Sequence, residues 1–317
     1  MEAALKALVE DEVAGDPEGG ARWIRRSLGS LQRALAEQGY ALCRETVRRL
    51  LHKMGIRPKS NVKCLTPQDH PDRDRQFQHI QAQVVAFRKA GWPIISVDTK
   101  KKELIGRFQK DGRVWCAEAP QVYIHDFPGD AVGKAVPYGI YDVLHNRGYV
   151  AVGQSADTAE FAVDAIVWWW ENFGRQHFPQ GLELLILADG GGSNGYRSRL
   201  WKQQLQLKLV DAFGLSVTVC HYPTGASKWN PVEHRLFSEI SKTWAGTPLT
   251  SFEIMLECIR STTTVAGLQV EAVLIDTEYK TGIRVSDAEM ETLVLERHDT
   301  CPDWNYTIRP RKTGSNF

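Results

Sequence analysis

The chain has 317 residues, of which 43% are hydrophobic and 24% charged, and its formal net charge is +1. These values are ordinary for a soluble globular protein with room for two domains. No apolar run approaches the ~20 residues that cross a bilayer, and the acidic N-terminus lacks the features of a signal peptide. We therefore expect a cytoplasmic protein with no membrane partner. The six cysteines form no C-x-x-C pair, which argues against a zinc site or a disulfide framework.

Positive charge is concentrated near the N-terminus. Residues 21–64 contain eleven Lys or Arg and two acidic residues, a pattern typical of nucleic-acid binding, although a solvated helical surface can look the same. Apolar residues at helical spacing predict two helices, the first including Trp23 and the second ending before Gly55. Because two helices around a turn resemble a helix-turn-helix, residues 1–64 are predicted as a small all-α DNA-binding region. Candidate DNA contacts on its second helix are Arg44, Arg48, Arg49 and Lys53.

The pattern changes after the basic block. Residues 65–90 are predicted as a polar, proline-containing linker followed by a helix. Strands that first form a meander and then alternate with helices are predicted over 91–265, which implies an α/β domain with a mixed sheet. Residues 266–317 are predicted as a C-terminal extension of short strands and turns. The strands expected in the main domain are 93–98, 113–124, 136–153, 182–189 and 215–221.

The stretch LLILADGGGSNG at 184–195 allows two interpretations. Its glycines fit the dinucleotide-binding pattern G-x-G-x-x-G, and Asp211 lies near the distance expected for an acid that binds ribose. However, the next strand ends in His221 rather than an acid, and the Asp189 carboxylate would repel a bound pyrophosphate. The alternative is a strand that delivers Asp189 to a metal ion. Asp98 ends another apolar strand in the same way, although either aspartate could simply be a turn or cap residue.

A third carboxylate opens a predicted helix in the stretch NPVEHRLF. Asn230 can cap this helix, Pro231 suits its first turn, and Glu233 occupies the position of a capping-box glutamate. The segment follows the strand expected beside the glycine-rich one, so Glu233 would also face the same edge of the sheet. Reserve candidates for a catalytic carboxylate are Asp126 and Asp142.

Three motifs together resemble one transposase family. SVDTKKKELIG, LADGGGSNG and HYPTGASKWNPVEHRLFS look like the corresponding segments of DDE transposases of the bacterial ISAzo13 insertion-sequence family, and more distantly of the IS630/Tc1/mariner group. Glu233 follows Asp189 by 44 residues, and the resemblance extends over roughly residues 20 to 308. Family members usually begin further upstream, so the resemblance implies a DNA-binding region that is incomplete at its N-terminus.

The resemblance implies an RNase H-like catalytic core with a mixed five-stranded sheet in the order 3-2-1-4-5, and a catalytic and metal-binding triad of Asp98, Asp189 and Glu233. Two Mg²⁺ ions roughly 3.5–4 Å apart, with Mn²⁺ able to substitute, would activate the nucleophile and stabilise the leaving oxygen. Asp98 would bridge both ions, whose preference for oxygen ligands suits carboxylates. Lys228 and Trp229 would contact DNA.

The reaction implied is cleavage and strand transfer of DNA at the ends of an insertion sequence. The partners would be the terminal inverted repeats and target DNA, and the active complex would be a homodimer or a higher oligomer associated with the nucleoid. Two alternatives remain open: a catalytically inactive, transposase-derived DNA-binding protein, and an NAD-dependent oxidoreductase.

Overall fold

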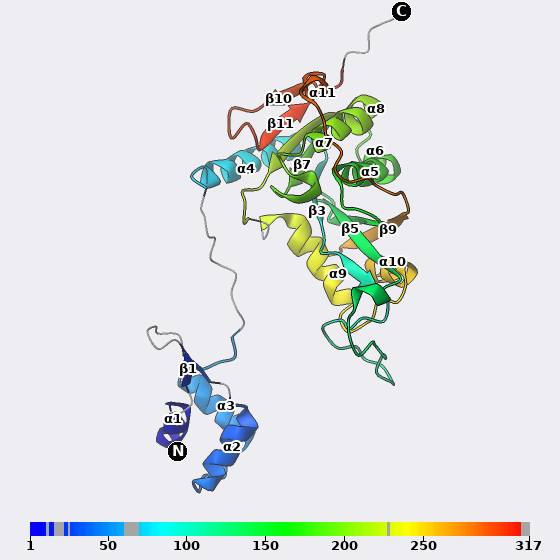
Figure 1. Ribbon diagram of the computed structural model, residues 1–317. Coiled ribbons are helices and arrows are strands. Elements are labelled where there is room, and N and C mark those ends of the chain that lie inside the picture. The colour runs from blue at the N-terminus through cyan, green and yellow to red at the C-terminus, as the bar shows by residue number, and fades with distance from the viewer. Residues whose placement is uncertain (11–12, 16–21, 25, 60–69, 227–228, 312–317) are drawn as a thin grey trace, which may run out of the picture. The chain divides into compact units, whose positions relative to one another are not determined.

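The computed structural model describes residues 1–10, 13–15, 22–24, 26–59, 70–226 and 229–311. The chain separates into two compact units, Met1–Leu65 and Thr66–Phe317 (Figure 1). Each unit has a hydrophobic core of its own. Within the described residues, no helix is long and apolar enough to cross a membrane.

The first unit contains three short helices and a small sheet. Its elements are α1 (Glu2–Glu10), β1 (Val13–Gly15), β2 (Arg22–Ile24), α2 (Leu28–Glu37) and α3 (Arg44–Lys53). Apolar side chains from all three helices meet in one core, in which Leu5, Leu35 and Val47 are fully buried. This burial explains why α3, whose outer face is strongly basic, is stable as a helix.

The prediction that this region is all-α is wrong, because β1 and β2 pair as an antiparallel sheet. Trp23 lies in β2 rather than in the first predicted helix. That helix begins at Leu28 because the Ser27 side chain caps it, accepting a hydrogen bond from the Ser30 N–H at 3.1 Å. The five-residue step from Trp23 to Leu28 also breaks the helical spacing of the apolar positions.

The second unit is built on a mixed sheet. Its five central strands are β3 (Ile94–Thr99), β5 (Gly133–Asp142), β6 (Arg147–Gly153), β7 (Glu183–Ala188) and β8 (Ser216–His221). They lie in the order β6-β5-β3-β7-β8, which in chain order is 3-2-1-4-5. The first three pair antiparallel, whereas β7 and β8 run parallel to β3. This is the strand order that the family resemblance implies.

The sheet is larger than the five strands predicted, because four further strands extend it to nine. They are β4 (Glu103–Ile105), β9 (Gln269–Ile275), β10 (Leu295–Arg297) and β11 (Asn305–Ile308). β9 pairs with β6 at one edge, and β11 pairs with β8 at the other. The C-terminal strands thereby cover edges whose backbone N–H and C=O groups would otherwise lack partners.

Helices cover both faces of the sheet (Figure 1). One face carries α5 (Ala159–Trp169) with its continuation η2 (Trp170–Gly174) and α6 (Arg175–His177), and α7 (Arg199–Gln204) with η4 (Leu205–Val210) and α8 (Asp211–Phe213). The other face carries α4 (Arg73–Ala90), η6 (Val232–Phe237) with α9 (Ser238–Thr243), and α10 (Phe252–Arg260). The short helices η1 (Pro128–Asp130), η3 (Gly192–Asn194) and α11 (Asp287–Glu291) lie in connecting segments. The result is a three-layer arrangement with a buried sheet.

The strand predicted over residues 113–124 is wrong, because these residues have no regular secondary structure. They form part of a long excursion between β4 and β5, in which the Trp115 side chain is fully exposed and Ile124 nearly so. Pro120 has no N–H to donate, and Tyr123 N donates to Arg107 O at 2.8 Å rather than to a neighbouring strand. A period-2 apolar pattern does not make a strand without a partner strand.

Candidate active site

The central parallel strands bring two carboxylates to one edge of the sheet. β3 and β7 are adjacent, and Val97 is in register with Ala188, so that Asp98 and Asp189 follow at neighbouring positions. Both side chains accept a hydrogen bond from the next backbone N–H, at 2.8 Å from Thr99 and 2.7 Å from Gly190. Both also line one cavity of about 310 Å³. The edge expected from the sequence is therefore the edge at which they meet.

Glu233 reaches this edge from η6, whose start is held against β3 by a buried serine. Ser96 Oγ donates to Asn230 Oδ1 and accepts the Val232 N–H at 3.0 Å, and Asn230 Nδ2 donates to Val97 O at 3.3 Å. The prediction that the Asn230 side chain caps the helix is therefore wrong, because that side chain is tied to β3. The Asn230 carbonyl accepts the Glu233 N–H at 3.1 Å, and the Glu233 side chain interacts with Asp98 through a hydrogen bond and its charge.

Two glycines in the sheet let this helix approach closely. Gly139 of β5 pairs directly with Asp98, and a Cβ added to Gly139 would lie 2.6 Å from Phe237 Cζ. At Gly148 of β6, an added Cβ would collide with Leu236 Cδ1. The helix that carries Glu233 thus packs on bare backbone beside Asp98.

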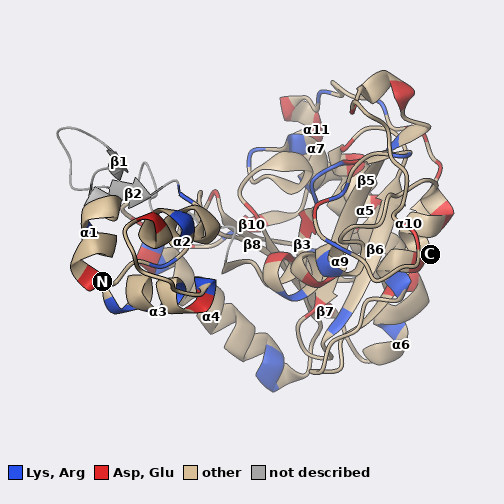
Figure 2. Cartoon of the chain, turned by 90° about the horizontal axis from the view of Figure 1, so that it is seen from below, with Lys and Arg blue, Asp and Glu red and all other residues tan. Residues whose placement is uncertain are grey.

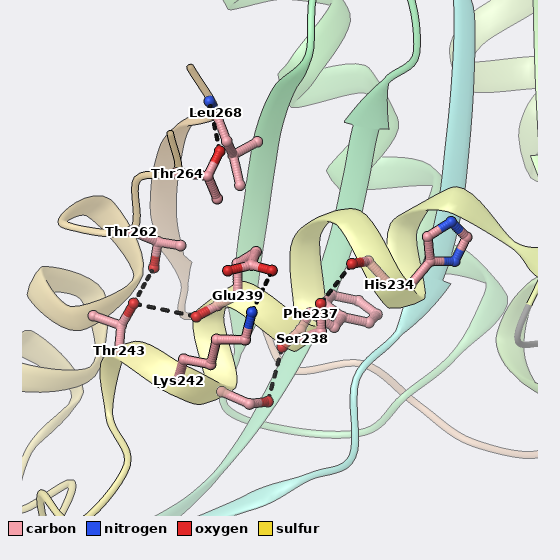
Figure 3. A network of polar contacts seen from close by, with 10 residues as sticks. His234, Phe237, Ser238, Glu239, Lys242, Thr243, Thr262, Thr264 and Leu268 are labelled. Atoms are coloured by element: carbon pink, nitrogen blue, oxygen red, sulfur yellow. Dashed lines mark hydrogen bonds and ion pairs between the residues drawn. The ribbon is translucent and has the colours of Figure 1, made fainter. Parts of the chain in front are cut away.

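The far end of the same helix is also anchored (Figure 3). Thr243 Oγ1 donates to the Glu239 carbonyl at 3.3 Å and lies 3.0 Å from Thr262 Oγ1, which belongs to the segment after α10. Lys242 forms an ion pair with Glu239 at 2.7 Å. Because the contact between Thr243 and Thr262 joins the end of α9 to another segment, the helix presents Glu233 from a rigid element.

The electrostatics show that the three carboxyl groups interact. Burial raises the pKa of Asp98 to about 8, with further contributions from the charge of Asp189 and from the charge and hydrogen bond of Glu233, while the Thr99 N–H opposes the shift. Burial also raises the pKa of Asp189, against a hydrogen bond from the Gly190 N–H. Several partly buried anions that oppose one another favour a divalent cation, and carboxylate oxygens are the ligands that Mg²⁺ prefers.

Sequence reasoning missed another acid that lines the cavity. Asp157 lines it together with Asp98 and Asp189, and Thr99 Oγ1 donates to Asp157 Oδ1 at 3.1 Å. The available signal was its position just before Thr158, the residue that caps α5. A residue at that position looks like part of the start of a helix. The sequence alone therefore does not reveal that Asp157 lies close to β3.

The lysines after Asp98 differ from one another. Lys100 forms an ion pair with Glu103 at 3.3 Å and lies 4.9 Å from the centre of the Trp244 ring. Lys101 and Lys102 are exposed at the mouth of the same cavity. These two lysines are therefore better placed than Lys100 to meet a phosphate.

Other sequence candidates lie elsewhere. Lys228 lies outside the described residues, and Trp229 is 54% exposed and packs edge-on against Phe77. Asp126 is exposed in the excursion before β5. His221 is fully buried between the Trp304 and Asn194 carbonyls, and burial lowers its pKa to about 4.

Asp142 is placed as a turn residue. It pairs with Ile95 at the other end of β3, and its carboxylate accepts the Leu144 and His145 N–H groups at 2.9 and 3.1 Å. With His145 and His177 it forms a set of possible metal ligands within 4.8 Å. Arg147 Nη1 lies 3.3 Å from His177 Nε2, and this cation disfavours a metal ion there.

The basic face of the first unit is formed by α3 (Figure 2). Arg44, Arg48, Arg49 and Lys53 are all exposed. Arg48 is paired with Glu45 at 2.5 Å, and Lys53 is paired with Glu2 at 2.6 Å. Surface pairs of this kind contribute little to stability, so the side chains can exchange partners.

The glycine turn after β7 is short, and its first backbone N–H already donates a hydrogen bond within the protein. Gly192–Asn194 form a 3-10 helix, and the Gly190 N–H that could meet a pyrophosphate donates instead to Asp189. Gly192 has a φ of 70°, in the left-handed region that favours glycine. The turn thus serves the geometry of Asp189 rather than that of a dinucleotide.

Comparison with known families decides the class. The sequence profile described as the Rhodopirellula transposase DDE domain matches residues 4–310. The chain belongs to this transposase family. It is accordingly a DDE transposase, an enzyme of the polynucleotidyl-transferase type, and the NAD-dependent alternative is wrong.

Solved structures similar to this transposase are complexes of Mos1 transposase. The Mos1 paired-end complex with the left transposon end is 14% identical with a TM-score of 0.41, and the Mos1 mariner paired end complex with Mn is 14% identical with a TM-score of 0.43. Each match covers 80% of this chain and 68% of the other. No curated protein matches the chain.

Proposed function

We propose that the second unit is an RNase H-like core in which Asp98, Asp189 and Glu233 hold two Mg²⁺ ions, or Mn²⁺ in their place, for DNA cleavage and strand transfer at insertion-sequence ends. The observation that supports this most is that Asp98 and Asp189 follow one another at the ends of adjacent parallel strands and line one cavity. The charge and hydrogen bond of Glu233 act on Asp98 as well, which adds to the effect of burial on its pKa. The bound ions would supply an activated nucleophile and stabilise the leaving oxygen.

The three carboxylates would have different roles in holding the metal ions. Asp98, on which the charges of both other acids act, would bridge both ions, while Asp189 and Glu233 would each hold one. The backbone N–H groups of Thr99 and Gly190 fix the carboxylates of Asp98 and Asp189 in orientation. The cleft would receive the scissile phosphate beside Lys101 and Lys102, whose charges favour an anion there.

The first unit would bind DNA through α3, as a helix-turn-helix with a small sheet beside it. Exposed Arg44 and Arg49 face away from the unit's core, as phosphate or base contacts require. Lys228 and Trp229, next to the catalytic glutamate, would add contacts near the cleavage site. Because both ends of an element must be joined, the active complex would be a homodimer or a higher oligomer. The site of action would be the cytoplasm, at the nucleoid.

A nicking assay tests the catalytic proposal. The substrate is a supercoiled plasmid that carries the gene with its flanking DNA, with Mg²⁺ or Mn²⁺ added. We expect the unaltered chain to nick this plasmid and Asp189→Asn to lose at least about a hundredfold in rate, because removing transition-state stabilisation of this kind typically has such effects. The matched control is Asp126→Asn, which removes an exposed acid outside the cavity.

The outcomes separate catalysis from DNA binding. Equal nicking by the unaltered chain and Asp189→Asn would contradict the proposed triad. If neither nicks while the chain still binds DNA, the inactive, DNA-binding alternative is correct. DNA binding through about six phosphates should weaken steeply between low and physiological salt, and Arg49→Ala should reduce that salt dependence. A flat salt response would remove the basic face of α3 from the proposal.

A further inference from the structure

A second cavity has a lining different from that of the cavity at Asp98 and Asp189. Its volume is about 730 Å³, within the range of small-molecule sites. The Trp304 ring forms part of its wall and is buried, with the His70 ring centre at 4.7 Å and the Tyr196 ring centre at 6.2 Å. The Arg197 guanidinium lies 5.1 Å from the centre of the Tyr196 ring. Planar groups therefore line this cavity on several sides.

We propose that this cavity holds one unpaired nucleobase of the DNA strand whose phosphate lies at the carboxylates, an inference that rests on the proposed function. Aromatic faces and guanidinium planes are the groups on which bases stack, whatever their sequence. Asp72 and Asp303 also line the cavity. Their carboxylates repel a phosphate but accept hydrogen bonds from exocyclic amino groups, so the lining suits a base and not the backbone.

The cavity adjoins the candidate active site through the glycine turn. A Cβ added to Gly190 would lie 3.8 Å from Tyr196 Cδ1, so the tyrosine ring lies beside the residue that follows Asp189. A nucleotide with its phosphate near Asp189 would have its base on the Tyr196 side of the turn. The two sites thus suit neighbouring parts of one DNA strand.

One buried histidine contacts both the wall of the second cavity and the glycine turn after Asp189. His221 Nδ1 lies 3.0 Å from the Trp304 carbonyl and Nε2 lies 2.9 Å from the Asn194 carbonyl. Trp304 belongs to the cavity wall, and Asn194 belongs to the turn that follows Asp189. A base stacked on this wall would therefore be positioned relative to the same turn that orients the Asp189 carboxylate.

The test measures how much the bases contribute to binding, with metal ions removed by EDTA so that no cleavage occurs. The probes are a fluorescent single-stranded oligodeoxycytidylate, whose bases carry an exocyclic amino group, and an abasic strand of the same length and charge. For the unaltered chain, we expect the abasic strand to bind about tenfold more weakly, because each stacked base contributes on this scale. Tyr196→Ala and His70→Ala should bring the two affinities close together. Both variants are checked for unaltered melting.

The matched control is Trp115→Ala, which removes a fully exposed aromatic ring outside the cavity and should leave the tenfold difference intact. Photocrosslinking with 5-iodouracil strands should label peptides that contain Tyr196 or Trp304. An abasic penalty that persists in both cavity variants, or crosslinks confined to other peptides, overturns the proposal. Because no metal or cleavage is involved, this result is independent of the nicking assay: loss of nicking by the unaltered chain would instead count against the proposed catalysis.

Discussion

The substitution Gly139→Ala tests directly whether the close packing of η6 on β5 sets the position of Glu233. The added methyl group would lie 2.6 Å from Phe237 Cζ and 3.1 Å from Val232 Cγ2, whereas carbon atoms pack best at about 3.5–4.0 Å. Phe237 is itself buried, so η6 must move away from β5 by about 1 Å. Overpacking of this kind costs about 1–3 kcal/mol of stability, and a 1 Å misplacement of a catalytic group can cost about a hundredfold in rate.

The expected result is therefore a folded protein that melts at a lower temperature and nicks DNA far more slowly, since Glu233 moves with η6. The assay compares metal-dependent plasmid nicking and thermal melting for Gly139→Ala and for Gly129→Ala. A Cβ at Gly129 meets nothing within 4 Å, so this control should behave like the unaltered chain. Wild-type nicking and melting by Gly139→Ala would refute the reasoning that the glycine sets the position of Glu233.

Three further substitutions test other contacts of the structure. Ser96→Ala leaves the buried Val232 N–H without its acceptor and should destabilise the protein by about 1–3 kcal/mol in urea denaturation; an unchanged midpoint would show that the hydroxyl is not needed. In metal-free protein, folded Asp98 keeps its proton up to about pH 8 and the unfolded chain releases it near pH 4, so stability should fall as pH rises through this window. Asp98→Asn should remove that fall in stability. Equal melting curves for Asp98→Asn and the unaltered chain at pH 8 would contradict this prediction. Cys43 starts α3 without a side-chain cap, so Cys43→Ser should protect the α3 amides from hydrogen exchange by about 0.5–2 kcal/mol, and unchanged exchange would count against it.

The central fold could be predicted because its signals are local. Apolar runs mark β3, β7 and β8, and the run that starts η6 is preceded by proline and asparagine. The edges of the sheet could not be predicted, because the place of β9 and β11 depends on long-range pairing with β6 and β8. The same limit explains the error at residues 113–124. Their apolar pattern resembles that of a strand, but the partner that would make it one is absent from the described residues.

The site was predictable to the extent that strand ends coincide in space. Asp98 and Asp189 end parallel neighbours, and parallel strands carry their last residues to one edge. Glu233 depends instead on a long-range contact, since Ser96 and Gly139 fix its helix from two different strands. No spacing rule in the chain encodes those contacts. Asp157 was missed for the same reason, because the hydroxyl of Thr99 brings it to the cavity across 58 positions of sequence.

The contacts around the triad also suggest why these carboxylates need a rigid frame. In the absence of cations, the negative charges of Asp189 and Glu233 act against ionisation of Asp98, so their proximity costs folding free energy. Flexible side chains would relax by moving apart. Here the Thr99 and Gly190 amides hold two of the acids, and the packing of Phe237 against Gly139 holds the helix of the third. Under the proposed function, the fold would keep this repulsion in place until divalent ions neutralised it, which would make metal binding more favourable than for three mobile carboxylates.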